Sequence, residues 1–169
     1  MSSDLLMRTL EHLRHLVAFD TRNPPRSIGT GGIFDYLRAN LPGFTCTVTD
    51  HGAGAVSLLA TRGNPAILFN VHLDTVPDAP GWTRNPLELQ ISADKAIGLG
   101  ACDIKGAAAA LLAAAEVTQG NAAFLFSTDE EANDARCIAA FLGSGHGFRD
   151  VIVSEPTNCQ AVLAHRGIA

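Results

Sequence analysis

Residues 104–127 read IKGAAAALLAAAEVTQGNAAFLFS, and this stretch decides the expected fold. Residues 104–119 are rich in alanine and leucine on nearly every face, which predicts a helix of strong intrinsic propensity packed closely against other elements. Residues 122–127 form a continuous apolar run, as expected of a strand that is covered on both faces. A helix followed by a buried strand is typical of α/β proteins.

The flanking sequence continues this alternation. Apolar residues recur at helical spacing between Leu5 and Val17, which predicts an amphipathic first helix. Further helices are expected over residues 32–40 and 133–142. The expected strands cover residues 56–61, 66–71, 87–91, 96–99, 151–154 (as a buried strand) and 161–165. We therefore expect an α/β fold with helices on both faces of a mainly parallel sheet.

Composition narrows the possible functions. The chain has 169 residues, 47% of them apolar and 17% charged, so it can bury a core as one domain or as part of a larger one. The net charge of −5 argues against a nucleic-acid partner. No apolar run reaches the roughly 20 residues that cross a bilayer, and the N-terminus lacks a signal-peptide pattern. We expect a cytoplasmic protein without membrane contact, whose scattered cysteines are reduced.

Polar residues gather where the expected strands end, which is where open α/β sheets carry their sites. His72 and Asp74 follow one strand with a spacing of two, so Asp74 can orient the imidazole ring. Three acidic clusters follow other elements: Asp103, Asp129-Glu130-Glu131 and Glu155. Each has a plain structural reading, since Asp103 can cap the next helix and the others can be solvated turn residues.

Taken together, the clusters favour a metal site. Carboxylates that converge without basic partners repel one another, and Lys105 is the one basic residue beside them in the sequence. A divalent cation removes the repulsion, and a mixed set of histidine and carboxylate ligands suits zinc, manganese or cobalt. The sequence therefore predicts a metal centre at the strand ends.

Four blocks carry a resemblance to a known family: LFNVHLDTVP (68–77), GLGACDIKGAAAALLAA (98–114), STDEEAN (127–133) and SEPT (154–157). In this order they resemble the active-site blocks of the di-zinc aminoacylase and carboxypeptidase family. FDTRNPPR (19–26) and VLAHRG (162–167) are most similar to its acetylornithine and acetylcitrulline deacetylase branch. The resemblance implies a zinc-exopeptidase-like catalytic domain.

The resemblance also implies roles for particular residues. His72 resembles a ligand of one metal, oriented by Asp74, and Asp103 resembles the carboxylate that bridges two metals through a turn whose Asp103–Ile104 peptide bond is cis in relatives. Glu130 resembles the general base. Glu131 resembles a ligand of the second metal, and Glu155 a ligand on the His72 side. The implied cofactors are two divalent ions, zinc or cobalt.

The implied reaction is metal-assisted amide hydrolysis, in which Glu130 takes a proton from the attacking water and passes it to the leaving amine. The substrate is an N-acyl amino acid, acetylornithine or acetylcitrulline, in arginine biosynthesis. Acetylornithine and acetylcitrulline differ in side-chain charge, and the resemblance implies that the groups reading this difference lie largely outside these residues. Succinylated amino acids, dipeptides and other N-acyl substrates stay open as alternatives.

Relatives are about twice this length, in keeping with two domains. The resemblance implies that residues 1–169 are the N-terminal part of a catalytic domain. It places a lid, through which relatives form homodimers, and the C-terminal part of that domain outside this chain. His165 matches the lid boundary and not the last histidine ligand, so the second metal site is expected to be incomplete.

Two hypotheses follow for the isolated chain. The first is a hydrolase module that is inactive alone and binds one metal weakly and the second hardly at all. The second is a non-catalytic remnant that associates, or binds a partner, through an exposed sheet edge.

Overall fold

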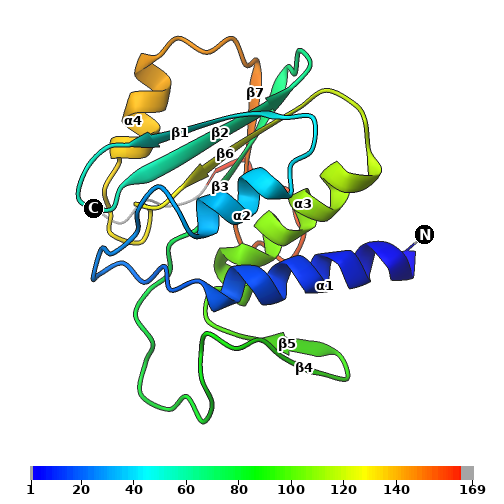
Figure 1. Ribbon diagram of the computed structural model, residues 1–169, viewed down its shortest axis with the longest axis vertical. Helices are drawn as coiled ribbons and strands as arrows, with labels where there is room; N and C mark the ends of the chain where they lie inside the picture. Colours follow the sequence, from blue (N-terminus) through cyan, green and yellow to red (C-terminus); the bar gives the residue numbers. More distant parts are fainter. Residues whose placement is uncertain (1, 165–169) are drawn as a thin grey trace.

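The computed structural model describes residues 2–164. A five-stranded sheet in the order β1-β2-β6-β3-β7 forms its centre, and a two-stranded hairpin, β4-β5, projects from it (Figure 1). The strands are β1 Thr45–Asp50, β2 Val56–Arg62, β3 Ile67–His72, β4 Gln90–Ser92, β5 Lys95–Ile97, β6 Ala122–Ser127 and β7 Asp150–Val153. The helices are α1 Ser2–Ala18, α2 Ile33–Ala39, α3 Gly106–Val117 and α4 Arg136–Gly143, with a π-helical turn, η1 Ala101–Lys105, before α3.

The sheet is mixed, with β1, β6, β3 and β7 running in one direction and β2 alone reversed. Strand β3 runs parallel to both β6 and β7, whereas β2 runs antiparallel to both β1 and β6. The cause is the length of the connections, because the turns before and after β2 are too short for a parallel crossover. The turn after β2 begins at Gly63, which has a φ of +68° and where an added Cβ would lie 2.0 Å from Asn121 Oδ1.

Helices cover both faces of the sheet, as the sequence predicts. The larger core lies between one sheet face and α1, α2 and α3, and it is built from side chains such as Leu16, Phe34, Leu112 and Phe126. A smaller core on the other face joins Leu68, Ala123 and Leu125 to α4 and the loop after it. Strand β6 lies at the centre of both cores, and its residues 123–127 are all buried.

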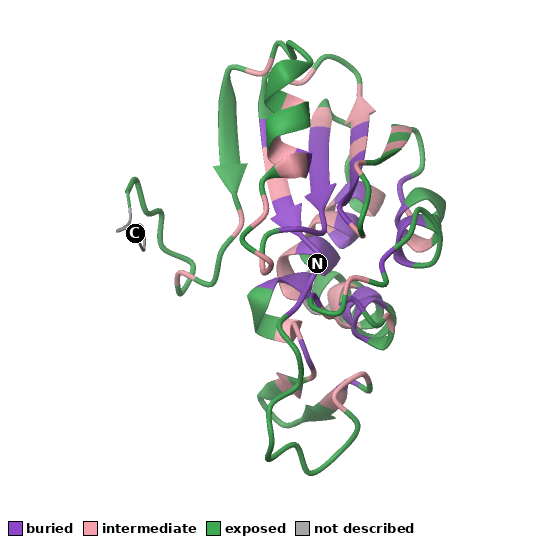
Figure 2. Cartoon of the chain, turned by 90° about the vertical axis from the view of Figure 1, so that its left-hand side faces the viewer, coloured by how far each residue is buried: buried purple, intermediate pink, exposed green. Residues whose placement is uncertain are grey.

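The two edge strands differ from the sequence-based expectation. Residues 151–154 were expected to form a buried strand, but all four residues of β7 are exposed, since no described element covers either face of it (Figure 2). Strand β1 was not predicted, because its threonines leave only a weak alternation with Cys46 and Val48. The strand expected over residues 161–165 is absent from residues 161–164, and its last residue lies outside the described part.

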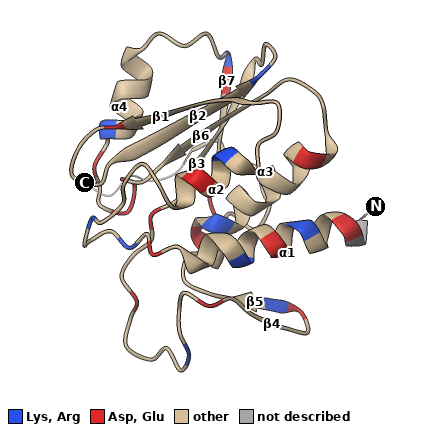
Figure 3. Cartoon of the chain, viewed as in Figure 1, with Lys and Arg blue, Asp and Glu red and all other residues tan. Residues whose placement is uncertain are grey.

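Lysine, arginine, aspartate and glutamate residues lie mostly on the helices and loops, and the central strands β3 and β6 contain none of them (Figure 3). Within residues 2–164, no helix combines the length and apolar character that spanning a membrane requires.

Candidate metal centre

The site lies where β3 and β6 end beside the turn η1. His72 is the last residue of β3 and pairs with Ser127, the last residue of β6, so the two loops that follow leave the sheet side by side. The loop after β6 carries Glu131, and η1 carries Asp103. Parallel pairing of β3 with β6 therefore brings His72 and the loop of Glu131 together, and η1 places Asp103 beside them through its contacts with β3.

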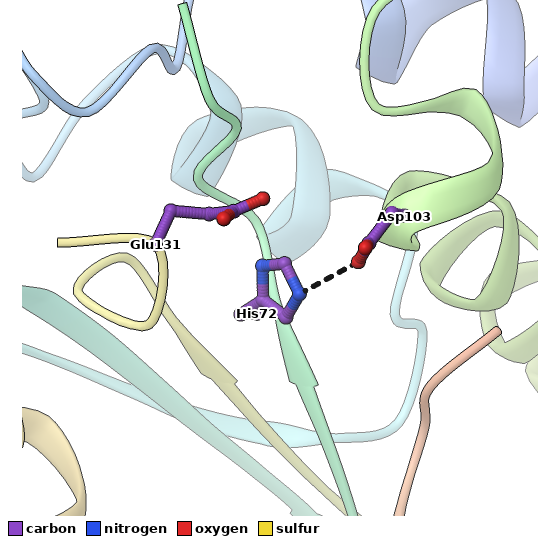
Figure 4. Close-up of side chains that lie close together, drawn as sticks. All are labelled: His72, Asp103 and Glu131. Atoms are coloured by element: carbon purple, nitrogen blue, oxygen red, sulfur yellow. Dashed lines mark hydrogen bonds and ion pairs between the residues drawn. The ribbon is translucent and has the colours of Figure 1, made fainter. Parts of the chain in front are cut away.

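Three side chains converge at this place (Figure 4). One ligand atom from each of His72, Asp103 and Glu131 lies within 4.8 Å of the other two. The Nε2 atom of His72 is 3.1 Å from Asp103 Oδ1. The Asp103–Ile104 peptide bond is cis, as the family resemblance implied.

Asp74 contacts both His72 and the loop that carries Glu131. Its side chain is fully buried, and its Oδ2 accepts hydrogen bonds from the Glu131 backbone N–H at 2.9 Å and from Asn23 Nδ2 at 3.4 Å. Its Oδ1 lies 3.5 Å from His72 Nδ1 and has no hydrogen-bond partner among the described residues. The Nδ1 atom of His72 is also 3.1 Å from the Asp74 carbonyl oxygen. These contacts hold the ring with Nε2 directed at Asp103, an arrangement typical of metal-binding histidines.

The charges around His72 favour a cation. Burial by itself lowers the pKa of His72, but Asp74 and the more distant carboxylates of Glu130 and Glu155 outweigh it and raise the pKa to about 9. Burial also raises the pKa of Glu131; the imidazolium of His72 opposes this rise, and the charge of Asp103 adds to it. The carboxylates therefore repel one another, and the protonated ring of His72 is the cation that they share. A divalent ion can replace the proton of this ring as the source of positive charge.

The donor set fits such an ion. One imidazole nitrogen and two carboxylates match the ligands that zinc, cobalt and manganese accept in proteins. The buried Asp74 Oδ1, which has no hydrogen-bond partner among the described residues, also fits. A metal bound at Nε2 requires the proton to stay on Nδ1, and Asp74 Oδ1 can accept a hydrogen bond from that N–H.

The other predicted residues are distributed around this group. Glu130 and Glu155 are both exposed and remain outside the group of three ligand atoms, although both act electrostatically on His72. Asp129 has a structural role instead, because its buried carboxylate accepts the Cys137 N–H at 2.9 Å in the first turn of α4. In the run 129–131, Asp129 thus binds the start of α4, Glu130 is exposed to solvent, and Glu131 belongs to the metal centre.

Sequence reasoning missed Asn23. This buried side chain donates to Asp74 Oδ2 and, at 3.1 Å, to the carbonyl oxygen of Thr128, while Arg26 Nε donates to its Oδ1 at 3.1 Å. It therefore ties Asp74 to the loop after β6. The only sequence signal was its place within FDTRNPPR, whose proximity to the strand ends depends on the bridge between Arg22 and Thr75.

A cavity of about 280 Å³ opens beside the centre. It is lined by Thr75, Val76, Trp82, Gly98, Leu99, Gly100, Ala101, Cys102, Asp103 and Glu131. Two of the three clustered side chains thus form part of a concave surface that a small molecule can enter.

Comparisons with known proteins agree with this geometry. The family described as peptidase family M20/M25/M40 matches residues 68–166. The N-acetyl-L-citrulline deacetylase of Xanthomonas campestris pv. campestris is 66% identical over 99% of this chain and 46% of its own length. The succinyl-diaminopimelate desuccinylase of Maricaulis maris is 33% identical over 81% of this chain and 39% of its own. The chain thus spans less than half the length of these curated relatives.

Solved structures share the fold. Human carnosine dipeptidase 1 superposes with a TM-score of 0.68 at 21% identity, over 87% of this chain and 38% of its own. An M20 family metallo-carboxypeptidase from Sulfolobus solfataricus gives a TM-score of 0.63 at 19% identity, over 86% and 36%. Both support the α/β architecture.

Proposed function

The chain belongs to peptidase family M20/M25/M40, and from that premise we propose that it carries the metal centre of an amide hydrolase that deacetylates an N-acetylated amino acid. The observation that supports this most is the convergence of His72, Asp103 and Glu131 within 4.8 Å. Acetyl-amino-acid hydrolysis is also the activity named for the relative that is 66% identical.

His72, Asp103 and Glu155 would hold one ion, and Asp103 and Glu131 would contribute to the site of a second. The preferred ions are zinc or cobalt, with the second site incomplete in this chain. When bound, such ions lower the pKa of a coordinated water toward neutrality and polarise a carbonyl group. Asp74 would keep the proton of His72 on Nδ1, so that Nε2 presents its lone pair.

Glu130 would act as the general base. This proposal is supported by its exposed carboxylate, which follows the buried strand β6, neighbours Glu131 in the sequence and acts electrostatically on His72. Glu130 would accept a proton as a water attacks the acetyl carbonyl, and return it to the nitrogen as the C–N bond breaks. The products are acetate and a free amino acid.

The relative that is 66% identical, an N-acetyl-L-citrulline deacetylase, supports an acetyl group over a succinyl group. The cavity beside the centre offers Val76 and Trp82 as apolar contacts for the acetyl methyl group. Acetylcitrulline and acetylornithine, in arginine biosynthesis, are the proposed substrates.

Three further features belong to the same proposal. Residues 1–169 form the N-terminal part of a catalytic domain, whose longer relatives pair through a lid domain. The enzyme is cytoplasmic. Its small-molecule substrate, and neither nucleic acid nor a membrane, is the proposed partner.

The test is acetate release from N-acetylcitrulline and N-acetylornithine with added zinc or cobalt. The chain, its Glu130→Gln variant and the control Glu88→Gln, which changes an exposed glutamate outside the site, are compared at equal metal occupancy. We expect very slow turnover or none by the chain alone, and any turnover to disappear in Glu130→Gln only. Turnover that survives Glu130→Gln contradicts the role of Glu130, and failure to bind metal contradicts the proposal.

The exposure of β7 favours a second function, association through the sheet edge. Val151, Ile152 and Val153 are 52%, 47% and 58% exposed, and the outer edge of β7 has no strand paired to it within the described residues. An unpaired apolar edge strand is a template for another strand. Sedimentation velocity across a concentration series tests this, since edge pairing predicts an oligomer and a monomer at all concentrations contradicts it.

A further inference from the structure

Lys105 is a buried lysine two residues after Asp103. Its side chain has 0% exposure, which is rare for lysine. Its Nζ donates a hydrogen bond to the carbonyl oxygen of Phe19 at 2.9 Å. The chain's other lysine, Lys95, is exposed on the hairpin strand β5.

The partner of Lys105 lies just past the C-terminal end of α1. Phe19 follows Ala18, the last residue of the helix, and its N–H bonds back to the Leu16 carbonyl at 3.3 Å. Carbonyl groups at a helix C-terminus carry partial negative charge and attract a cation. The amine thus links the end of α1 to the turn that carries Asp103.

The same residue closes that turn. The Lys105 N–H donates to the Gly100 carbonyl at 2.8 Å, and the Ala101 N–H donates to the Gly98 carbonyl at 3.1 Å. Gly100 has a φ of +73°, and a Cβ added there would lie 2.5 Å from Thr75 Cγ2 and 3.3 Å from Lys105 Cδ. The lysine stem therefore packs beneath Gly100, and both ends of the turn are fixed.

Asp103 depends on this support. Its side chain is 51% exposed, and its one hydrogen-bonding contact to a side chain found in the described residues is to His72. The backbone turn must therefore set where the carboxylate lies.

We propose that Lys105 is a positioning residue: its buried amine, anchored on the Phe19 carbonyl, holds the turn 100–105 so that the Asp103 carboxylate faces His72. This inference rests on the proposed metal centre.

The test compares Lys105→Met with Lys95→Met at pH 7. Methionine keeps the length and apolar stem of lysine and removes the amine. Two readouts are needed: amide hydrogen exchange of the metal-free chain, and Co²⁺ affinity measured from visible absorption. In Lys105→Met we expect the Ala101 and Lys105 amides to exchange at least about tenfold faster. We expect Co²⁺ affinity to fall about 10–100-fold, as for other residues that orient metal ligands.

Thermal unfolding separates positioning from a merely structural role. Leu37→Ala, in the buried core of α2, lowers the melting temperature without touching the turn and should leave Co²⁺ affinity per folded chain unchanged. Lys105→Met should lower affinity whether or not the melting temperature falls. Unchanged affinity and unchanged amide exchange in Lys105→Met overturn the inference. If the unmodified chain binds no Co²⁺, the metal proposal fails, and amide exchange alone still decides whether Lys105 holds the turn.

Discussion

At the scale of single residues, His72 controls whether the centre is ready for metal. Its pKa is raised to about 9 because the surrounding carboxylates outweigh the effect of burial, so the metal-free histidine is protonated at neutral pH. A ligand must lose this proton before it binds, and metal binding therefore competes with protons.

We accordingly predict that Co²⁺ affinity rises by up to about tenfold per pH unit between pH 6.5 and 9. Calorimetric titration at several pH values, in buffers of different ionisation enthalpy, measures the affinity and the protons released. An affinity that is flat over this range, with no proton release, contradicts the assignment of His72.

Lys105 makes the stability of the folded chain depend on pH. Burial lowers the pKa of folded Lys105 from 10.5 to about 7, against a weaker opposing effect of Asp20. Between these two pH values the amine is protonated in the unfolded chain and neutral in the folded chain. Stability from this group therefore rises with pH from about 7 toward 10.5. His72 acts oppositely: its raised pKa stabilises the folded chain below pH 6.5, and this contribution is lost as pH rises through about 9.

The two effects partly cancel in the unmodified metal-free chain. In Lys105→Met the rising component is removed, so stability should fall from pH 7 to pH 9 relative to the unmodified chain, by on the order of 2 kcal/mol. Urea unfolding at the two pH values measures this difference. A difference that does not change with pH would show that Lys105 does not titrate in this range.

Asn23 links the first loop to the centre. Asn23→Ala removes the donor to Asp74 and to the Thr128 carbonyl, both buried, and should cost about 1–3 kcal/mol of stability. Loss of orientation at Asp74 should also weaken Co²⁺ binding by about tenfold or more. The control is Asn121→Ala, which changes an exposed asparagine before the first residue of β6, at the opposite end of the strand from the centre, and should leave Co²⁺ binding unchanged. Equal effects in both variants would rule out a specific role for Asn23.

Much of this centre was predictable from strand ends. His72, Asp103 and Glu131 each follow or precede a strongly apolar element, so the sequence placed them at one edge of the sheet. Asn23 was not predictable, because its role depends on where the loop 19–26 crosses the sheet. The burial of His12 in α1 was not predictable either, because it depends on the arrival of α2 and α3: its ring nitrogens lie 2.8 Å from the Tyr36 hydroxyl and 3.0 Å from Glu116 Oε1.

At the scale of elements, the helices and central strands followed local periodicity, whereas strand direction and edge burial did not. Strand β2 reverses because its connections are short, and β7 is exposed because burial depends on neighbours that local sequence does not specify. Hydrophobic periodicity indicates which face of a segment can be buried, but it does not indicate whether another element packs on that face.

The exposed β7 yields a prediction at this scale. Ile152→Lys places a charge on the edge strand and should shift the chain toward monomer, because like charges prevent two edges from pairing. Val117→Lys, at the exposed end of α3, is the matched control and should leave the association unchanged. Sedimentation velocity measures both variants, and an oligomer that persists in Ile152→Lys contradicts association through β7.

At the scale of the whole molecule, the central claim is that His72, Asp103 and Glu131 form a metal centre in a chain spanning less than half the length of its curated relatives. The acidic balance of the chain, −5, does not by itself create such a site. A test must therefore separate these ligands from the general attraction of surface carboxylates for cations.

Calorimetric titration of zinc or cobalt into the chain makes this separation, with Asp103→Asn compared against Asp94→Asn, an exposed aspartate in the β4-β5 turn. We predict one weak site per chain, a second that hardly fills, loss of binding in Asp103→Asn, and retention of binding in Asp94→Asn. No binding by the unmodified chain, two tight sites, or binding that survives Asp103→Asn would contradict it.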